Sequence, residues 1–184
     1  MNYLDIKNYD VSNGTGVRVS LFVSGCTHHC KGCFNPESWD FNAGKPFTDE
    51  TIDYIIELLK PDYIKGLTLL GGEPMEPSNQ EALLPLVKKV KELYPNKDIW
   101  CYTGYLFDKQ IMDIMVPKYE TTKEIIKYFD TVVDGEFHIK EKDLTRIFRG
   151  SRNQRIIDVK ETLKKGSVVL DPKNDVVRGK LNEN

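Results

Sequence analysis

Three cysteines lie within eight residues of each other in this chain of 184 residues. Cys26, Cys30 and Cys33 follow the pattern C-x3-C-x2-C, in a segment that we expect to be a loop between a strand and a helix. Three neighbouring thiolates suit three irons of a four-iron, four-sulfur cluster. The fourth iron would then lack a protein ligand and would be open to a small molecule. The spacing therefore predicts a cluster that does chemistry on a bound substrate.

A structural zinc site is the alternative interpretation of these cysteines. Its fourth ligand would be His28, His29 or Cys101. Structural zinc usually takes four protein ligands in two short pairs, whereas this chain offers one trio and no second pair. Cys101 lies inside the apolar run 99–102, which is typical of an inert core residue. The trio favours the iron–sulfur interpretation.

The elements that must position this loop alternate between strand and helix. Residues 17–23 alternate in polarity and predict a strand that leads into the cysteines. Further strands are expected at 66–70, 99–102 and 131–133, and helices at about 48–59, 83–94, 106–115 and 121–129. This alternation favours a mostly parallel sheet covered by helices, with the working residues at the carboxyl ends of the strands. A full eight-unit barrel needs about 250 residues, so we expect an α/β fold of the partial, open (β/α) barrel type.

Length and composition limit the classes of protein to which the chain belongs. We expect a single domain over residues 1–184, with a polar, loose tail from about 172 to 184. A net charge of −2 gives no support for nucleic-acid or anionic-membrane binding. No apolar run reaches the roughly 20 residues of a transmembrane helix, and the first residues do not resemble a secretory signal. We therefore expect a cytoplasmic protein whose thiols stay reduced.

A second candidate site is the turn Gly71-Gly72-Glu73-Pro74, which directly follows an apolar strand. Two glycines allow a ligand to approach the backbone closely, and Glu73 offers an acceptor to a cation. Taken alone, the turn is equally well explained as purely structural.

Together, the cysteine loop and this turn resemble the radical S-adenosylmethionine (radical SAM) superfamily. The resemblance implies that the open iron binds the amine and carboxylate of S-adenosylmethionine (SAM), and that one electron splits it into methionine and a 5′-deoxyadenosyl radical. It also implies a set of residues around SAM: Gly71, Gly72, Glu73 and Pro74 at the methionyl amine, and Gly32, Cys33 and Phe34 at the adenine. Gly32 stands where the superfamily commonly has an aromatic residue, so Phe34 is the candidate for stacking. Thr103 and Asp134 are candidates for the ribose or substrate side, and each is equally well explained as a capping or turn residue.

Residues 16–26 resemble the entry to the cluster loop in enzymes that install glycyl radicals, and residues 33–39 resemble the activating proteins of the anaerobic (class III) ribonucleoside-triphosphate reductase. That family also has a glycine before the third cysteine, and residues 134–137 and 149–156 resemble its tail. The resemblance covers residues 2–170. It implies that the radical takes hydrogen from a glycine in the large subunit of that reductase, with electrons from a donor such as a flavodoxin.

Arg146, Arg149, Arg152 and Arg155 lie three residues apart, which fits a solvated helical face. Gly150 argues instead for a loop, which could grip a partner segment. Three rival functions remain open: an activase of another glycyl-radical enzyme such as pyruvate formate-lyase, a radical SAM enzyme acting on a free metabolite, and a zinc-stabilised interaction module.

Overall fold

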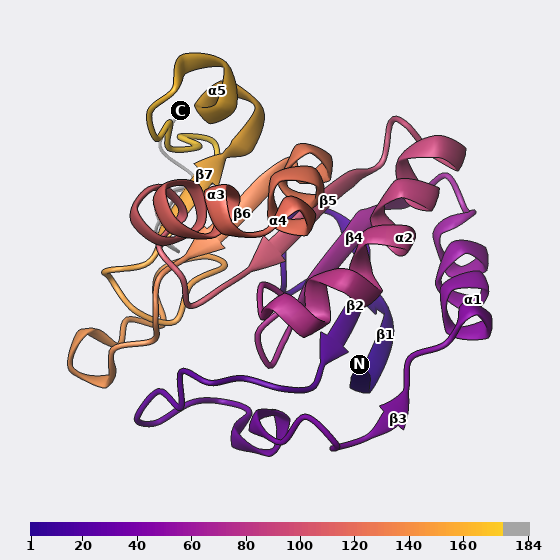
Figure 1. The fold of residues 1–184 in the computed structure, drawn as a ribbon, viewed down its shortest axis with the longest axis horizontal. Helices are drawn as coiled ribbons and strands as arrows, with labels where there is room; N and C mark the ends of the chain where they lie inside the picture. The colour runs from indigo at the N-terminus through magenta and orange to yellow at the C-terminus, as the bar shows by residue number, and fades with distance from the viewer. Residues whose placement is uncertain (175–184) are drawn as a thin grey trace.

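The computed structural model describes residues 1–174, so positions 175–184 of the expected loose tail lie outside it. Its framework is a seven-stranded sheet in the order β3-β1-β2-β4-β5-β6-β7 (Figure 1). The strands are β1 (Asn2–Asp10), β2 (Val17–Val23), β3 (Lys45–Pro46), β4 (Ile64–Gly71), β5 (Asp98–Tyr102), β6 (Thr131–Asp134) and β7 (Arg155–Asp158). The four strands expected from the sequence, β2, β4, β5 and β6, pair in parallel at the centre.

The outer strands were not expected, and they change the sheet. β1 and β3 add antiparallel strands at one edge, and β7 adds an antiparallel strand to β6 at the other. Within the described residues the sheet does not close, because β3 and β7 are its two ends. The expected α/β class and open sheet are therefore confirmed, whereas a barrel of the radical SAM type is not.

The helices follow the predicted pattern in part. They are α1 (Asp49–Leu59), α2 (Pro77–Leu93), α3 (Val116–Lys118), α4 (Glu120–Ile125) and α5 (Val159–Lys165), with short 3-10 turns η1 (Pro36–Trp39), η3 (Ile126–Tyr128) and η4 (Ile139–Glu141). α2 begins earlier than expected, α5 was not predicted, and two other helices differ in type. Thr48 and Thr51 form a capping box at the start of α1. The predicted helix 106–115 is the π-helical η2 (Phe107–Met115), and the predicted helix 121–129 ends as the 3-10 turn η3.

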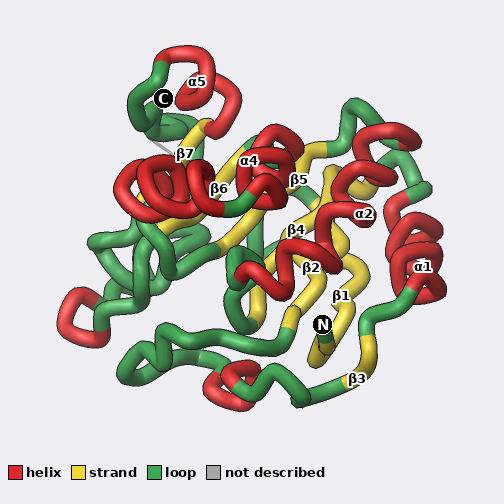
Figure 2. Tube along the Cα trace, viewed as in Figure 1, coloured by secondary structure: helices red, strands yellow, loops and turns green. Residues whose placement is uncertain are grey.

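The two faces of the sheet have different roles. Val19, Leu21 and Val23 are fully buried in the core that β2 shares with α1 and α2, and Figure 2 shows these helices lying over the sheet. Burying each such side chain stabilises the fold by roughly 1.5–3 kcal/mol. Because side chains alternate along a strand, Arg18, Ser20 and Phe22 point to the other face.

On this second face Arg18 is buried, so its charge needs a partner. The Arg18 side chain is fully buried and lies 2.5 Å from Asp98. Its Nε donates to Thr68 at 2.7 Å, and its guanidinium lies 5.4 Å from the Trp100 ring centroid. The buried charge is thereby paired and hydrogen-bonded, as stability requires.

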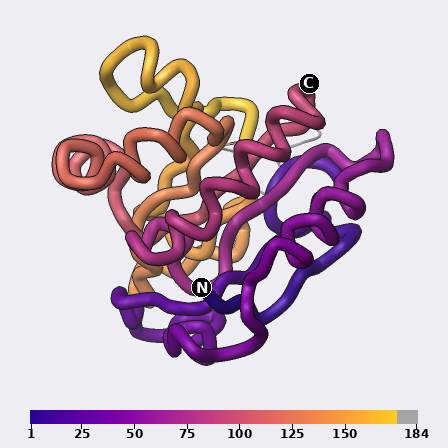
Figure 3. The backbone as a smooth tube through the Cα atoms, turned by 45° about the vertical axis from the view of Figure 1, so that its right-hand side comes forward, coloured from indigo at the N-terminus to yellow at the C-terminus, as the bar shows by residue number. Residues whose placement is uncertain are grey.

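The carboxyl ends of the four parallel strands carry the loops that matter for function. The loop after β2 contains the cysteines, and residues 135–154 after β6 form a second long loop. Figures 1 and 3 show these two segments side by side at one end of the sheet. In the described part of the chain, no helix is both long and apolar enough to cross a membrane.

Candidate functional site

A cavity of about 500 Å³ lies against the sheet face that the helices leave open. Phe22, Leu70, Tyr102 and Val133 form its base, one from each parallel strand. The predicted site residues that line it are Cys26, Cys30, Cys33, Phe34, Gly71, Gly72, Glu73 and Thr103. Gly32, Pro74 and Asp134 are not among the lining residues. The structure thus brings the cysteine loop and the glycine-rich turn to one cavity.

All four cysteines of the chain are free, and three of them face this cavity. Burial raises the pKa of Cys26 to about 11, although the backbone N–H groups of His28 and His29 oppose the rise. Burial also raises the pKa of Cys30, against the backbone N–H of Phe137. The N–H of Asn35 donates to the Cys33 sulfur at 3.4 Å. Hydrogen bonds of the kind that Asn35 makes to Cys33 are a recognised influence on iron–sulfur clusters.

The donor set fits a cluster better than a single metal ion. Among the described residues, no three His, Cys, Asp or Glu side chains are grouped to hold one metal ion. The thiolates of a four-iron cluster bind different irons and so lie farther apart than the ligands of one ion. The three thiols line one cavity of about 500 Å³, and their sulfur chemistry suits iron–sulfur ligation.

The glycine-rich turn is packed directly on the cysteine loop. Gly72 N donates to Val23 O at 2.7 Å, and Glu73 N donates to Gly25 O at 2.8 Å. A Cβ atom on Gly72 would lie 2.6 Å from Gly25 O, so only glycine fits there. Gly71 has a φ of +108°, which also favours glycine.

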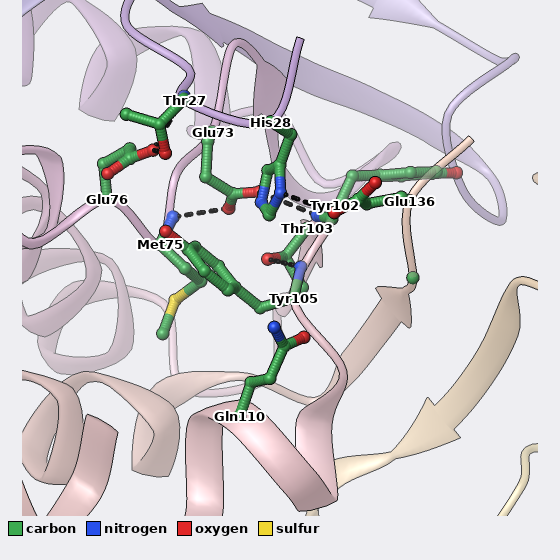
Figure 4. A network of polar contacts seen from close by, with 12 residues as sticks. Thr27, His28, Glu73, Met75, Glu76, Tyr102, Thr103, Tyr105, Gln110 and Glu136 are labelled. Carbon is green, nitrogen blue, oxygen red and sulfur yellow. Dashed lines mark hydrogen bonds and ion pairs between the residues drawn. The ribbon is translucent and has the colours of Figure 1, made fainter. Parts of the chain in front are cut away.

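The Glu73 carboxylate lies at the centre of a buried network (Figure 4). Its side chain is 1% exposed. One oxygen accepts from Met75 N at 2.8 Å, and the other accepts from Gly104 N at 2.7 Å. Nε2 of His28 lies 3.1 Å from the second oxygen. Glu73 therefore joins the loops after β2, β4 and β5.

His28 is a site residue whose position sequence reasoning missed, because it was considered only as a zinc ligand. Its Nδ1 lies 3.1 Å from Glu136, and its ring packs on Tyr105 at 4.4 Å between centroids (Figure 4). Burial alone would lower the pKa of His28, but contacts with Glu73 and Glu136 raise it above its usual value. Both acidic partners follow strands far along the chain, so no local pattern signals these contacts.

Asp134 and Thr103, two of the predicted site residues, accept hydrogen bonds from other groups of the protein. Asp134 is fully buried, and its oxygens accept from Arg155 Nε at 2.9 Å and from Phe107 N at 2.8 Å. Thr103 lines the cavity, and its Oγ1 accepts from Tyr105 N at 3.1 Å.

The arginines at 146, 149 and 152 lie outside the helices and strands, and Arg155 begins β7. The helical interpretation of this segment is therefore wrong, and the loop interpretation based on Gly150 is confirmed.

Residues 12–157 match the family model of a 4Fe-4S single cluster domain, which places the chain among iron–sulfur proteins. The anaerobic ribonucleoside-triphosphate reductase-activating protein of Haemophilus influenzae is 47% identical over 85% of this chain and 97% of its own length. The proteins of the same name from Enterobacteria phage T4 and Escherichia coli (strain K12) are 42% and 40% identical, over 93% and 96% of their lengths and 85% and 84% of this chain. The chain belongs to the family of anaerobic ribonucleoside-triphosphate reductase-activating proteins.

Proposed function

We propose that this protein uses a 4Fe-4S cluster to cleave SAM reductively and generates a glycyl radical on the large subunit of the anaerobic ribonucleoside-triphosphate reductase. One observation carries the proposal: the three cysteines and the Gly71–Glu73 turn face the same cavity. The relatives are named as activators of that reductase, which supports the choice of target.

Cys26, Cys30 and Cys33 would hold three irons and leave the fourth open to SAM. When bound, the cluster supplies one electron to the sulfonium, so that the S–C5′ bond breaks, methionine leaves and the 5′-deoxyadenosyl radical takes hydrogen from the glycine α-carbon. The protein's own task is to position SAM and to exclude competing reactions.

Glu73 would receive the methionyl ammonium group. A carboxylate oxygen can accept two hydrogen bonds, and the oxygen that accepts from Met75 keeps one of these sites. The backbone donors of Met75 and Gly104 hold the carboxylate in one orientation. Gly71 and Gly72 let the ligand approach the main chain, and Pro74 supports the turn behind them.

The adenine would lie near the third cysteine. Phe34 lines the cavity with 66% of its surface exposed, and its ring centroid lies 5.1 Å from that of Phe137. An exposed ring in this position suits stacking on a base. Gly32, with a φ of +77°, would leave main-chain atoms around Cys33 free for the adenine edge. Thr103 would contact the ribose, and Asp134 would support this side from behind through Arg155.

The electron would come from a one-electron donor such as a flavodoxin, in the cytoplasm, where thiols remain reduced. Cys30 and Cys33 are only partly buried, which leaves a short path from the surface to the cluster. The net charge of −2 gives no basis for a nucleic-acid partner.

The test is an electron spin resonance experiment without oxygen. Reduced protein and SAM are mixed with the anaerobic reductase, with pyruvate formate-lyase, or with a reductase whose target glycine is replaced by alanine. We expect a glycyl radical with the unmodified reductase alone. A radical formed only on pyruvate formate-lyase would instead support the rival activase, which the family match does not favour.

A further inference from the structure

The loop after β6 begins at residues 135–137, and these are held by the arginine-rich segment, residues 149–155, which forms the end of the same loop and the start of β7. Gln154 Nε2 donates to Gly135 O at 3.0 Å, and Asn153 Nδ2 donates to Glu136 O at 2.8 Å. Two consecutive carbonyls of the loop therefore receive side-chain donors from this segment.

The segment is itself held in a defined shape. Gln154 Oε1 accepts from the N–H groups of Gly150 and Ser151, at 2.8 and 3.1 Å. Arg149 donates to Gln154 O at 3.2 Å. At the end of the segment, Arg155 pairs with Asp134, the residue directly before Gly135. The side-chain amide of Gln154 thus holds the shape of the segment with its oxygen and binds Gly135 with its nitrogen.

Residues 135–137 in turn contact the cysteine loop at two points. Glu136 lies 3.1 Å from His28, between the first and second cysteines. The Phe137 ring packs on Phe34, directly after the third cysteine, with 5.1 Å between the ring centroids. Packing adds to this arrangement, because a Cβ on Gly150 would lie only 3.0 Å from the Phe137 ring and 3.1 Å from the Phe34 ring.

We propose that the arginine-rich segment fixes residues 135–137 against the cysteine loop, and that Gln154 and Asn153 are positioning residues for the surroundings of Cys30. These contacts give the segment a task within the protein itself. The inference rests on the proposed function only in taking Cys30 as an iron ligand.

Two measurable consequences follow. In the metal-free protein, loosening residues 135–137 should speed hydrogen exchange of their amides. In the loaded protein, loosening Glu136 and Phe137 next to the cysteine loop should shift the cluster potential, because the charges and packing around a cluster tune it.

Gln154→Glu is the sharpest variant. It keeps an acceptor oxygen for Gly150 and Ser151 but replaces the donor that faces Gly135 O with a second acceptor. Asn153→Ala tests the neighbouring bond independently, should Gln154→Glu fail to fold. Arg152→Ala is the matched control, because this exposed side chain belongs to the same segment.

We expect Gln154→Glu and Asn153→Ala to speed amide exchange at 135–137 by about fivefold in the metal-free protein, as loss of one hydrogen bond implies. We also expect a shifted cluster potential in both, with Arg152→Ala unchanged in both measurements. Wild-type exchange and potential in both test variants would overturn the inference. If the wild type takes up no cluster, the proposed function fails, while the exchange measurement still decides whether the segment holds residues 135–137.

Discussion

Replacing Glu73 by glutamine tests the buried network most sharply. The carboxylate accepts from Met75 N at 2.8 Å and from Gly104 N at 2.7 Å, one with each oxygen. A glutamine has one acceptor oxygen, so in either orientation its NH₂ group faces a backbone N–H. The variant loses one hydrogen bond to a charged group and leaves a buried donor without a partner, which together cost about 2–4 kcal/mol.

The free energy of unfolding of the metal-free protein, from urea denaturation under reducing conditions, measures this cost without the cluster or SAM. Glu136→Gln is the matched control. Its carboxyl also contacts His28, but it is 46% exposed, so we expect a loss below about 1 kcal/mol. Equal losses in the two variants would refute the network as described. The result also matters for function, because weaker SAM binding by Glu73→Gln is meaningful only at temperatures where the variant is folded.

Two further predictions concern the framework. Gly72→Ala should lower the melting temperature and the yield of folded protein, because its Cβ would meet Gly25 O at 2.6 Å; an unchanged melting temperature would contradict this packing. Asp130 accepts from Lys91 at 2.7 Å and Lys160 at 2.5 Å. Burial alone would raise the pKa of Asp130, but the two lysines lower it by more than burial raises it. The pKa in the folded state therefore lies below the unfolded value of about 3.9. Asp130→Asn should therefore lower the free energy of unfolding by about 1–3 kcal/mol at pH 7. In urea denaturation, the difference between wild type and variant should shrink below about pH 4, where Asp130 becomes protonated. A difference that stays constant with pH would contradict this role of Asp130.

The sequence predicted the parallel centre of the fold because each element there has a strong local pattern. β2 and the start of α1 match their predicted residues, and the ends of four strands meet as expected. The outer strands β1, β3 and β7 form through pairing with distant segments, and the local pattern of residues does not reveal such pairing. Arg155 meets Asp134 only because β7 adds antiparallel to β6, with these two residues opposite each other in the register.

In the candidate site, too, features with a local sequence pattern were predicted and long-range contacts were not. The cysteine spacing and the Gly-Gly turn predicted which loops converge, and both line the cavity. The contacts of Glu73 with His28 and Gly104 could not be predicted, since they join three loops that only the sheet brings together.

The central claim is that one iron is left open by Cys26, Cys30 and Cys33 and binds SAM directly. The most direct measurement is the electron spin resonance spectrum of the reduced cluster, with SAM carrying ¹⁵N in its amine or ¹⁷O in its carboxylate. The account predicts that SAM changes the spectrum and that both labels couple to the cluster, in the wild type and in Cys101→Ala, whose thiol lies in the core. A spectrum that saturating SAM leaves unchanged would contradict it.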